Sequence, residues 1–191
     1  QFLKLTLTLC FFVFLVFSAR AANAATLYFS PSSGNFTVGN IFTVNVLVNT
    51  EGVSVNNAEA TVNFPSGLLE IISFSKSGSI FSLWVEEPTF SNTAGTLSFN
   101  GGLPTPGFNG VSGKVLSAVF RVKRAGSATM VFSSPAVRAN DGYGTNVLRT
   151  GIQALYNLVA AEARPIISPT PVPKAPVVVA GFEISSSTHP D

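Results

Sequence analysis

The segment Gly113–Ser133, GKVLSAVFRVKRAGSATMVFS, decides the predicted fold. Apolar residues alternate with polar or mixed ones on both sides of a short connection, Lys123–Gly126, which contains two basic residues and a glycine. Alternation with a period of two places successive side chains on opposite faces of a β-strand. A glycine-containing connection between two such runs is typical of a β-hairpin. Because a lone hairpin is marginally stable in water, we expect further strands to cover its apolar face.

The composition is typical of a β-rich secreted protein. Of the 191 residues, 46% are hydrophobic and only 10% are charged, and phenylalanine, with 17 copies, is the most frequent aromatic residue. No long segment combines a helical period with a charged face. The length is sufficient for one domain of ordinary size plus additional segments.

Residues 1–24 have the pattern of a secretory signal peptide. Lys4 precedes the apolar run Leu5–Phe17, and the small residues Ala22 and Ala24 follow it. The alternative is a membrane anchor, but the apolar run is short for a membrane-spanning helix. We therefore predict a leader cleaved after Ala24 and a secreted or cell-surface location. Membrane attachment is expected only through an anchor outside this sequence.

Removal of this leader would change two properties of the chain. The only cysteine, Cys10, would leave with it, so the mature chain could form neither a disulfide nor a thiolate metal site. Lys4 and Arg20 would also leave, and 9 basic residues would remain against 9 acidic ones. This balance does not suit a nucleic-acid-binding surface, so we predict no nucleic-acid partner.

Alternating segments recur about every ten residues between Thr26 and Val159. A second hairpin is predicted, in which Thr89–Asn92 and Thr96–Asn100 flank the turn Thr93–Gly95. The other predicted strands are Thr26–Ser30, Ile41–Asn49, Asn57–Phe64, Leu69–Phe74, Ile80–Val85 and Ile152–Val159. About nine strands at this spacing predict an all-β fold, an antiparallel β-sandwich with jelly-roll topology.

Turn residues divide the chain into its predicted parts. Pro31 and the turn Ser32–Asn35 end the first strand, and Gly101–Gly113 is expected to be an exposed loop. The β-sandwich is assigned to residues 25–160. Residues 161–176 contain five prolines and are predicted to form a semi-extended linker. Residues 177–191 have the pattern of the incomplete start of a second β module.

Several segments of the predicted sandwich resemble the cohesin domain, the receptor module of cellulosomal scaffoldins. These segments are Phe42–Val48, Asn57–Pro65 with Leu69–Ile71, Gly113–Lys123, and Thr129–Phe132 leading to Ala139–Asp141. The resemblance extends from about Thr26 to Val159. It implies a nine-stranded jelly roll without a cofactor. It also implies a non-catalytic role, in which the exposed face of one sheet binds a dockerin module.

The resemblance also implies the position of the binding face. Asn57 and Glu59 match positions where the family places polar contacts, and Val115 and Val119 would supply an apolar patch. The hairpin Thr89–Asn100 would complete the face. The full set of predicted partner-binding residues is Asn57, Glu59, Thr61, Asn63, Val115, Ser117, Val119 and Arg121. The expected function is to tether a dockerin-like protein, in the context of polysaccharide breakdown.

The residues predict no catalytic site, and therefore no enzyme. The only histidine, His189, lies beyond the linker, so the domain has no histidine for a serine–histidine–aspartate triad. Glu86 and Glu87 are adjacent and would point to opposite faces of a strand, whereas glycoside hydrolysis needs two carboxylates across one cleft.

Two alternative functions and one alternative interpretation of a loop remain open. In the first, Trp84, with Phe81 and Phe90, stacks on sugars, and the domain is a carbohydrate-binding or adhesive module with a glycan partner. Such aromatic residues more often belong to a core. A purely structural spacer in a surface stalk is the second. The third is a weak calcium loop, but with a single carboxylate a polar turn without metal is favoured. The calcium ligands would be Asn140, Asp141, Thr145 and Asn146.

Overall fold

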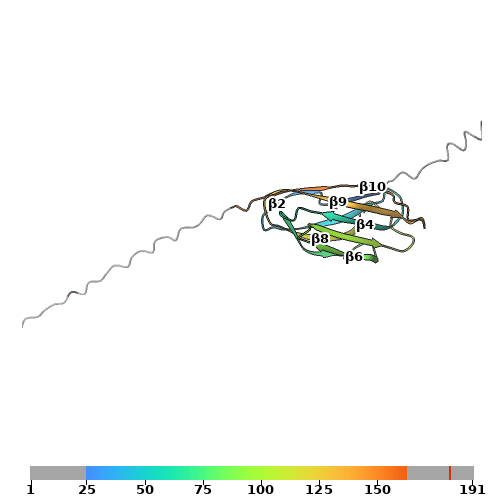
Figure 1. Ribbon diagram of the computed structural model, residues 1–191, viewed down its shortest axis with the longest axis horizontal. Coiled ribbons are helices and arrows are strands. Elements are labelled where there is room, and N and C mark those ends of the chain that lie inside the picture. Colours follow the sequence, from blue (N-terminus) through green and yellow to red (C-terminus); the bar gives the residue numbers. More distant parts are fainter. Residues whose placement is uncertain (1–24, 163–180, 182–191) are drawn as a thin grey trace, which may run out of the picture. The chain divides into compact units, whose positions relative to one another are not determined.

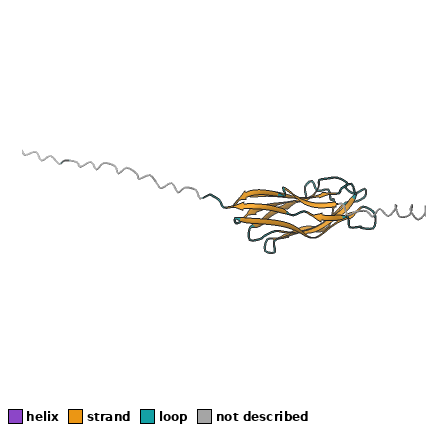
Figure 2. Cartoon of the chain, turned by 90° about the horizontal axis from the view of Figure 1, so that it is seen from above, coloured by secondary structure: helices purple, strands orange, loops and turns teal. Residues whose placement is uncertain are grey.

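The computed structural model describes residues 25–162 and residue 181. The predicted signal peptide lies outside the described residues, as do nearly all of the predicted linker and second module. The described residues form strands and loops and contain no helix (Figure 2). Accordingly, no helix suited to crossing a membrane is found among them.

Eleven strands form two sheets, of five and six strands (Figure 1). The five-stranded sheet has the order β10 (Leu148–Gly151), β1 (Ala25–Ser30), β3 (Ile41–Asn49), β8 (Gly113–Val122) and β5 (Leu69–Ser75). The six-stranded sheet has the order β2 (Ser33–Thr37), β11 (Ala154–Val159), β9 (Gly126–Ala139), β4 (Val55–Asn63), β7 (Thr96–Gly102) and β6 (Leu83–Ser91). The predicted all-β jelly-roll sandwich is confirmed, with eleven strands in place of nine.

The additional strands arise where the chain changes sheet. The predicted turn Ser32–Asn35 lies largely within β2, because the chain leaves the five-stranded sheet at Pro31 and then pairs with β11. The predicted strand Ile152–Val159 is preceded by a separate strand, β10, which pairs with β1. Both of these pairings are parallel, whereas the sequence predicted only antiparallel ones.

The segment Gly113–Ser133 forms two strands as predicted, but these strands are not a hairpin. β8 pairs with β3 and β5, whereas β9 pairs with β4 and β11. The connection between β8 and β9 therefore crosses from one sheet to the other, and their apolar faces meet across the core. The second predicted hairpin is confirmed, since β6 and β7 are antiparallel neighbours with Ser91 opposite Thr96.

The core lies between the sheets and is rich in aromatic side chains. Its largest fully buried side chains include Tyr156, Phe29 and Phe120. Phe29 stacks on Phe132 with ring centroids 4.2 Å apart. Burial of one such side chain contributes about 1.5–3 kcal/mol. The inner faces of both sheets are thus used for folding, and their outer faces are left for other contacts.

Val115 does not follow the alternation predicted for its strand. Leu116 lies opposite Val46 and Lys114 opposite Leu47, so Val115 is an extra residue in β8, as in a β-bulge. Val115 and Leu116 are both fully buried. The prediction that Val115 points outward toward a partner is therefore wrong.

Candidate functional site

The residues predicted to form one binding face lie on two different sheets. Asn57, Glu59, Thr61 and Asn63 belong to β4 in the six-stranded sheet, whereas Ser117, Val119 and Arg121 belong to β8 in the five-stranded sheet. Because the two sheets pack through their inner faces, these groups point to opposite sides of the sandwich. The prediction of a single face, which rested on the family resemblance, is wrong, because β4 and β8 belong to different sheets.

We call the two outer surfaces face A and face B. Face B is the outer surface of the five-stranded sheet, represented by Ser117, Val119 and Arg121 of β8 with Thr43 of β3 and Glu70 of β5. Face A is the outer surface of the six-stranded sheet over β6, β7, β4 and β9. The side chains that define face A are Leu83, Glu86, Thr89, Ser98, Asn100, Asn57, Glu59, Thr61, Asn63, Val131, Ser133 and Arg138.

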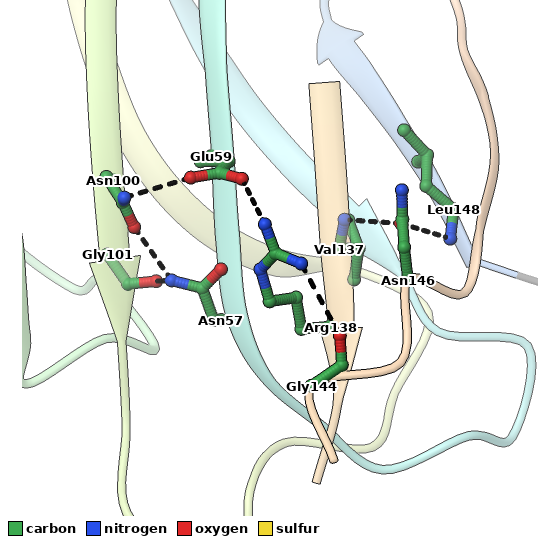
Figure 3. A network of polar contacts seen from close by, with 9 residues as sticks. All are labelled: Asn57, Glu59, Asn100, Gly101, Val137, Arg138, Gly144, Asn146 and Leu148. Carbon is green, nitrogen blue, oxygen red and sulfur yellow. Dashed lines mark hydrogen bonds and ion pairs between the residues drawn. The ribbon is translucent and has the colours of Figure 1, made fainter. Parts of the chain in front are cut away.

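An ion pair with an added amide contact lies at the centre of face A (Figure 3). Glu59 Oε1 accepts a hydrogen bond from Arg138 Nη2 at 2.6 Å, which joins β4 to β9. Glu59 Oε2 accepts one from Asn100 Nδ2 at 2.9 Å, which joins β4 to β7. Both carboxylate oxygens are therefore held, and the side chain of Glu59 has one defined position.

Further contacts extend this network to both sides of Glu59 (Figure 3). Asn57 Nδ2 donates to Asn100 Oδ1 at 2.8 Å and to the Gly101 carbonyl at 2.9 Å. Arg138 Nη1 donates to the Gly144 carbonyl at 3.4 Å, which connects the loop after β9 to the sheet. Side chains fixed in this way lose less conformational entropy when a partner binds.

Hydroxyl and amide groups continue the polar surface along β4. Thr61 Oγ1 and Ser98 Oγ lie 2.9 Å apart, and Asn63 Nδ2 donates to Ser133 Oγ at 2.9 Å. Next to these contacts lies a shallow hollow of about 280 Å³. Its lining residues are Glu59, Ala60, Thr61, Glu86, Ser98, Phe99, Asn100 and Ser134.

Exposed apolar side chains flank the polar network. Leu83 is 58% exposed and lies opposite Gly102, in the same row as Asn57. Val131 is 38% exposed and lies opposite Asn63. Tyr143 is 92% exposed and adjoins Gly144, the residue that accepts from Arg138. Face A thus combines a fixed polar centre with apolar side chains near its edges, as protein-binding surfaces do.

Trp84 does not form the exposed aromatic platform considered as an alternative. Its side chain packs against the core, and its ring lies edge-on to Phe81 with centroids 6.1 Å apart. Lys76 Nζ lies over the ring, 5.3 Å from the centroid. Phe81 is itself buried, and Phe90 packs edge-on against Phe74. The flat, open surface that sugar stacking requires is therefore not present at Trp84.

The loop Asn140–Asn146 is a hydrogen-bonded turn. Asp141 Oδ1 accepts from the backbone N–H groups of Tyr143 at 2.9 Å and Gly144 at 3.1 Å. The Thr145 side chain, followed by the Tyr143 backbone, lowers the pKa of Asp141 through hydrogen bonds. Two other candidate ligands are also engaged, since Asn146 Oδ1 accepts from two backbone N–H groups and Asn140 Oδ1 from two side chains. In the part of the chain that is described, no group of three His, Cys, Asp or Glu residues is placed to hold a metal ion.

Arg138 and Asn100 are the members of the network that the sequence did not single out. Arg138 is the only charged residue in the otherwise uncharged segment Gly126–Ala139. A lone charge in a strand suggests an ionic partner on a neighbouring strand. That partner could not be named, because the pairing of β9 with β4 was not predicted.

Comparisons with known proteins support the fold. No family model matches the chain, and no curated protein does. Solved structures do match. A chain of a type I cohesin–dockerin complex from Clostridium thermocellum is 9% identical, with a TM-score of 0.62 over 75% of this chain and 99% of that one. The seventh ScaB type I cohesin from Pseudobacteroides cellulosolvens is 15% identical, with a TM-score of 0.58 over 73% and 95%.

An archaeal structure matches as well. The non-cellulosomal cohesin from the hyperthermophile Archaeoglobus fulgidus is 16% identical, with a TM-score of 0.57 over 71% of this chain and 91% of that chain. At such low identity the similarity concerns the fold. The β-sandwich described for this protein has the fold of a cohesin domain.

Proposed function

We propose that the domain is a non-catalytic protein-binding module, and that face A binds a partner of the dockerin type. The observation that carries this proposal is the network around Glu59, which holds side chains from β4, β7 and β9 in place on an uncovered sheet. The fold adds support, because it is shared with chains of cohesin–dockerin complexes from two bacteria, Clostridium thermocellum and Acetivibrio cellulolyticus.

The chemistry of face A suits reversible association. Hydrogen-bonding groups lie at its centre, and Leu83, Val131 and Tyr143 are available for apolar contacts near its edges. Tyrosine is enriched among the residues that dominate binding energy at protein interfaces. Association would thus combine apolar burial with hydrogen bonds, and no covalent step is involved.

We further propose a tethering role at the cell surface or outside the cell. The predicted leader, residues 1–24, and the proline-rich segment 161–176 are the features that favour this location, and both are sequence predictions. A role in polysaccharide breakdown is one setting for such a tether. One neighbour of the same fold is described as non-cellulosomal, so the fold is compatible with other settings.

A matched pair of substitutions tests which face binds. Thr89 on face A and Thr43 on face B are both exposed strand residues. Binding of the full chain to a panel of purified type I dockerin modules would be measured by calorimetry. We expect T89R to weaken binding at least about tenfold, because an arginine placed there obstructs face A. T43R should leave binding unchanged, and both variants should keep the melting temperature of the wild type.

Two results would overturn the proposal. If the wild-type protein binds no dockerin module in the panel, the assignment of a dockerin-type partner is wrong. Equal weakening by T43R and T89R would show that face A is not the binding surface.

A further inference from the structure

We propose that face A recognises a basic side chain of its protein partner, and that Glu86 supplies the carboxylate that selects it. This inference rests on the proposed function, since it specifies the chemistry of one contact in the same face. The occupant of the hollow on face A would be the head of a lysine or arginine side chain that projects from the partner.

The hollow lies on the outer surface of face A, and its volume suits a single long side chain. Its lining comes from β4, β7 and β6, with Ser134 from β9, and its volume is about 280 Å³. Figure 3 shows two of the lining residues, Glu59 and Asn100, side by side on adjacent strands. The network on one side and the edge strand β6 on the other therefore border the hollow.

The charge of the lining is negative. The two charged residues in the lining are Glu59 and Glu86. Arg138 compensates Glu59 at 2.6 Å. Glu86 is exposed and forms no ion pair with any described residue, whereas its neighbour Glu87 is paired with Lys76 at 2.6 Å. One uncompensated negative charge is thus left beside the hollow.

The charged groups around the hollow are carboxylates, and most of the neutral groups are already bonded to one another or to Glu59. The Asn100 amide group already donates to Glu59, and the Asn57 amide group donates to Asn100. The hydroxyls of Thr61 and Ser98 are bonded to each other. Carboxylate lone pairs remain available, and these call for a donor that carries positive charge. A carboxylate or phosphate of a partner would meet repulsion at the same place.

The register of the strands places the two carboxylates on either side of one amide. Glu86 of β6 and Glu59 of β4 are both opposite Asn100 of β7. Since neighbouring strands lie about 4.8 Å apart, a cation above Asn100 would be roughly 5 Å from each carboxylate-bearing strand. The register of β6 shifts on both sides of Glu86, and irregularities of this kind redirect side chains at sheet edges.

Nuclear magnetic resonance can test this contact without a known partner. The isotope-labelled full chain would be titrated at low salt with N-acetyl-arginine amide, and separately with N-acetyl-citrulline amide, which has the same shape without the charge. We expect saturable shifts of the Thr61, Ser98 and Asn100 amides with the arginine probe alone. E86Q should weaken this binding about three- to fivefold, the upper part of the range for an exposed ion pair. E70Q, on face B, is the matched control and should have no effect.

Three outcomes would overturn the inference. One is equal binding of the citrulline probe, and another is an unchanged affinity in E86Q. The third is that calcium chloride causes the same shifts, which would identify a general cation effect.

The same variants separate this inference from the proposed function. If T89R abolishes capture of a dockerin module while E86Q changes neither capture nor arginine binding, the proposed function stands and the basic contact is refuted. If the arginine probe binds as expected but no dockerin module does, the dockerin-type partner is refuted, and the basic contact holds for a protein of another kind.

Discussion

Face A and face B carry similar groups but connect them differently. Each has one glutamate–arginine pair between neighbouring strands, Glu59–Arg138 at 2.6 Å on face A and Glu70–Arg121 at 2.9 Å on face B. The exposed fractions of the paired side chains are also similar, 30% and 40% on face A and 31% and 47% on face B.

The difference lies in what surrounds each pair. On face A, Asn100 and the Gly144 carbonyl also bind the pair, so three strands and a loop are joined. On face B, the pair makes no other side-chain hydrogen bond among the described residues. Because an isolated exposed pair contributes little, charge content alone does not identify a binding surface, and the connections between charged groups are more informative.

The largest expected effect is a loss of stability on substitution in the core, and we expect this loss to be similar for the two sheets. Leu97 on β7 and Leu116 on β8 are both fully buried in the shared core. Either leucine-to-alanine substitution should lower the free energy of unfolding by about 2–5 kcal/mol, measured by urea denaturation. A much smaller loss for one of them would indicate that the two sheets do not share a single cooperative core.

Alkaline pH should distinguish a buried tyrosine of the six-stranded sheet from a more accessible one of the five-stranded sheet. Desolvation strongly raises the pKa of Tyr156 and also raises that of Tyr28. In the unfolded chain the Tyr156 hydroxyl ionises near pH 10, whereas in the folded domain it stays neutral. The contribution of Tyr156 to the free energy of unfolding is therefore fully present below about pH 10 and is lost as the pH rises further.

Melting temperatures measured between pH 8 and pH 12 would test this expectation. Y156F should be less stable than the wild type at neutral pH, because the hydroxyl donates to the Pro31 carbonyl at 2.7 Å, but its stability should decline less above pH 10. Y28F should change the alkaline profile less. Identical alkaline profiles for Y156F and the wild type would contradict the assignment.

The smallest expected effect is the difference in coupling free energy between the two ion pairs. Double-mutant cycles with alanine at both members should give a coupling free energy of about 1 kcal/mol for Glu59–Arg138 and about 0.3 kcal/mol for Glu70–Arg121. The larger value reflects the shared contacts of Glu59 with Asn100. Equal couplings would mean that the network adds nothing to the pair, and high salt should reduce both values.

Much of the fold could be predicted from individual segments. The alternation in Ile41–Asn49 and Asn57–Asn63 correctly indicated strands with one buried face, and the turn Thr93–Gly95 correctly indicated a hairpin. Val115 could not be assigned from alternation, because it is the extra residue in β8 and is buried next to Leu116. Val115 is thus buried, and the other seven of the eight predicted binding residues lie on two different faces because β4 and β8 belong to different sheets.

The amino-acid sequence by itself determined most of the extended segments and, for most residues, which side chains are buried, because both depend on a local period of two. Only the tertiary structure decided which strands are neighbours, since the alternation shows which face of a strand is apolar but not which strands form hydrogen bonds with its edges. The candidate site depends on that choice. Glu59, Asn100 and Arg138 are far apart along the chain, and they meet because β4 lies between β7 and β9.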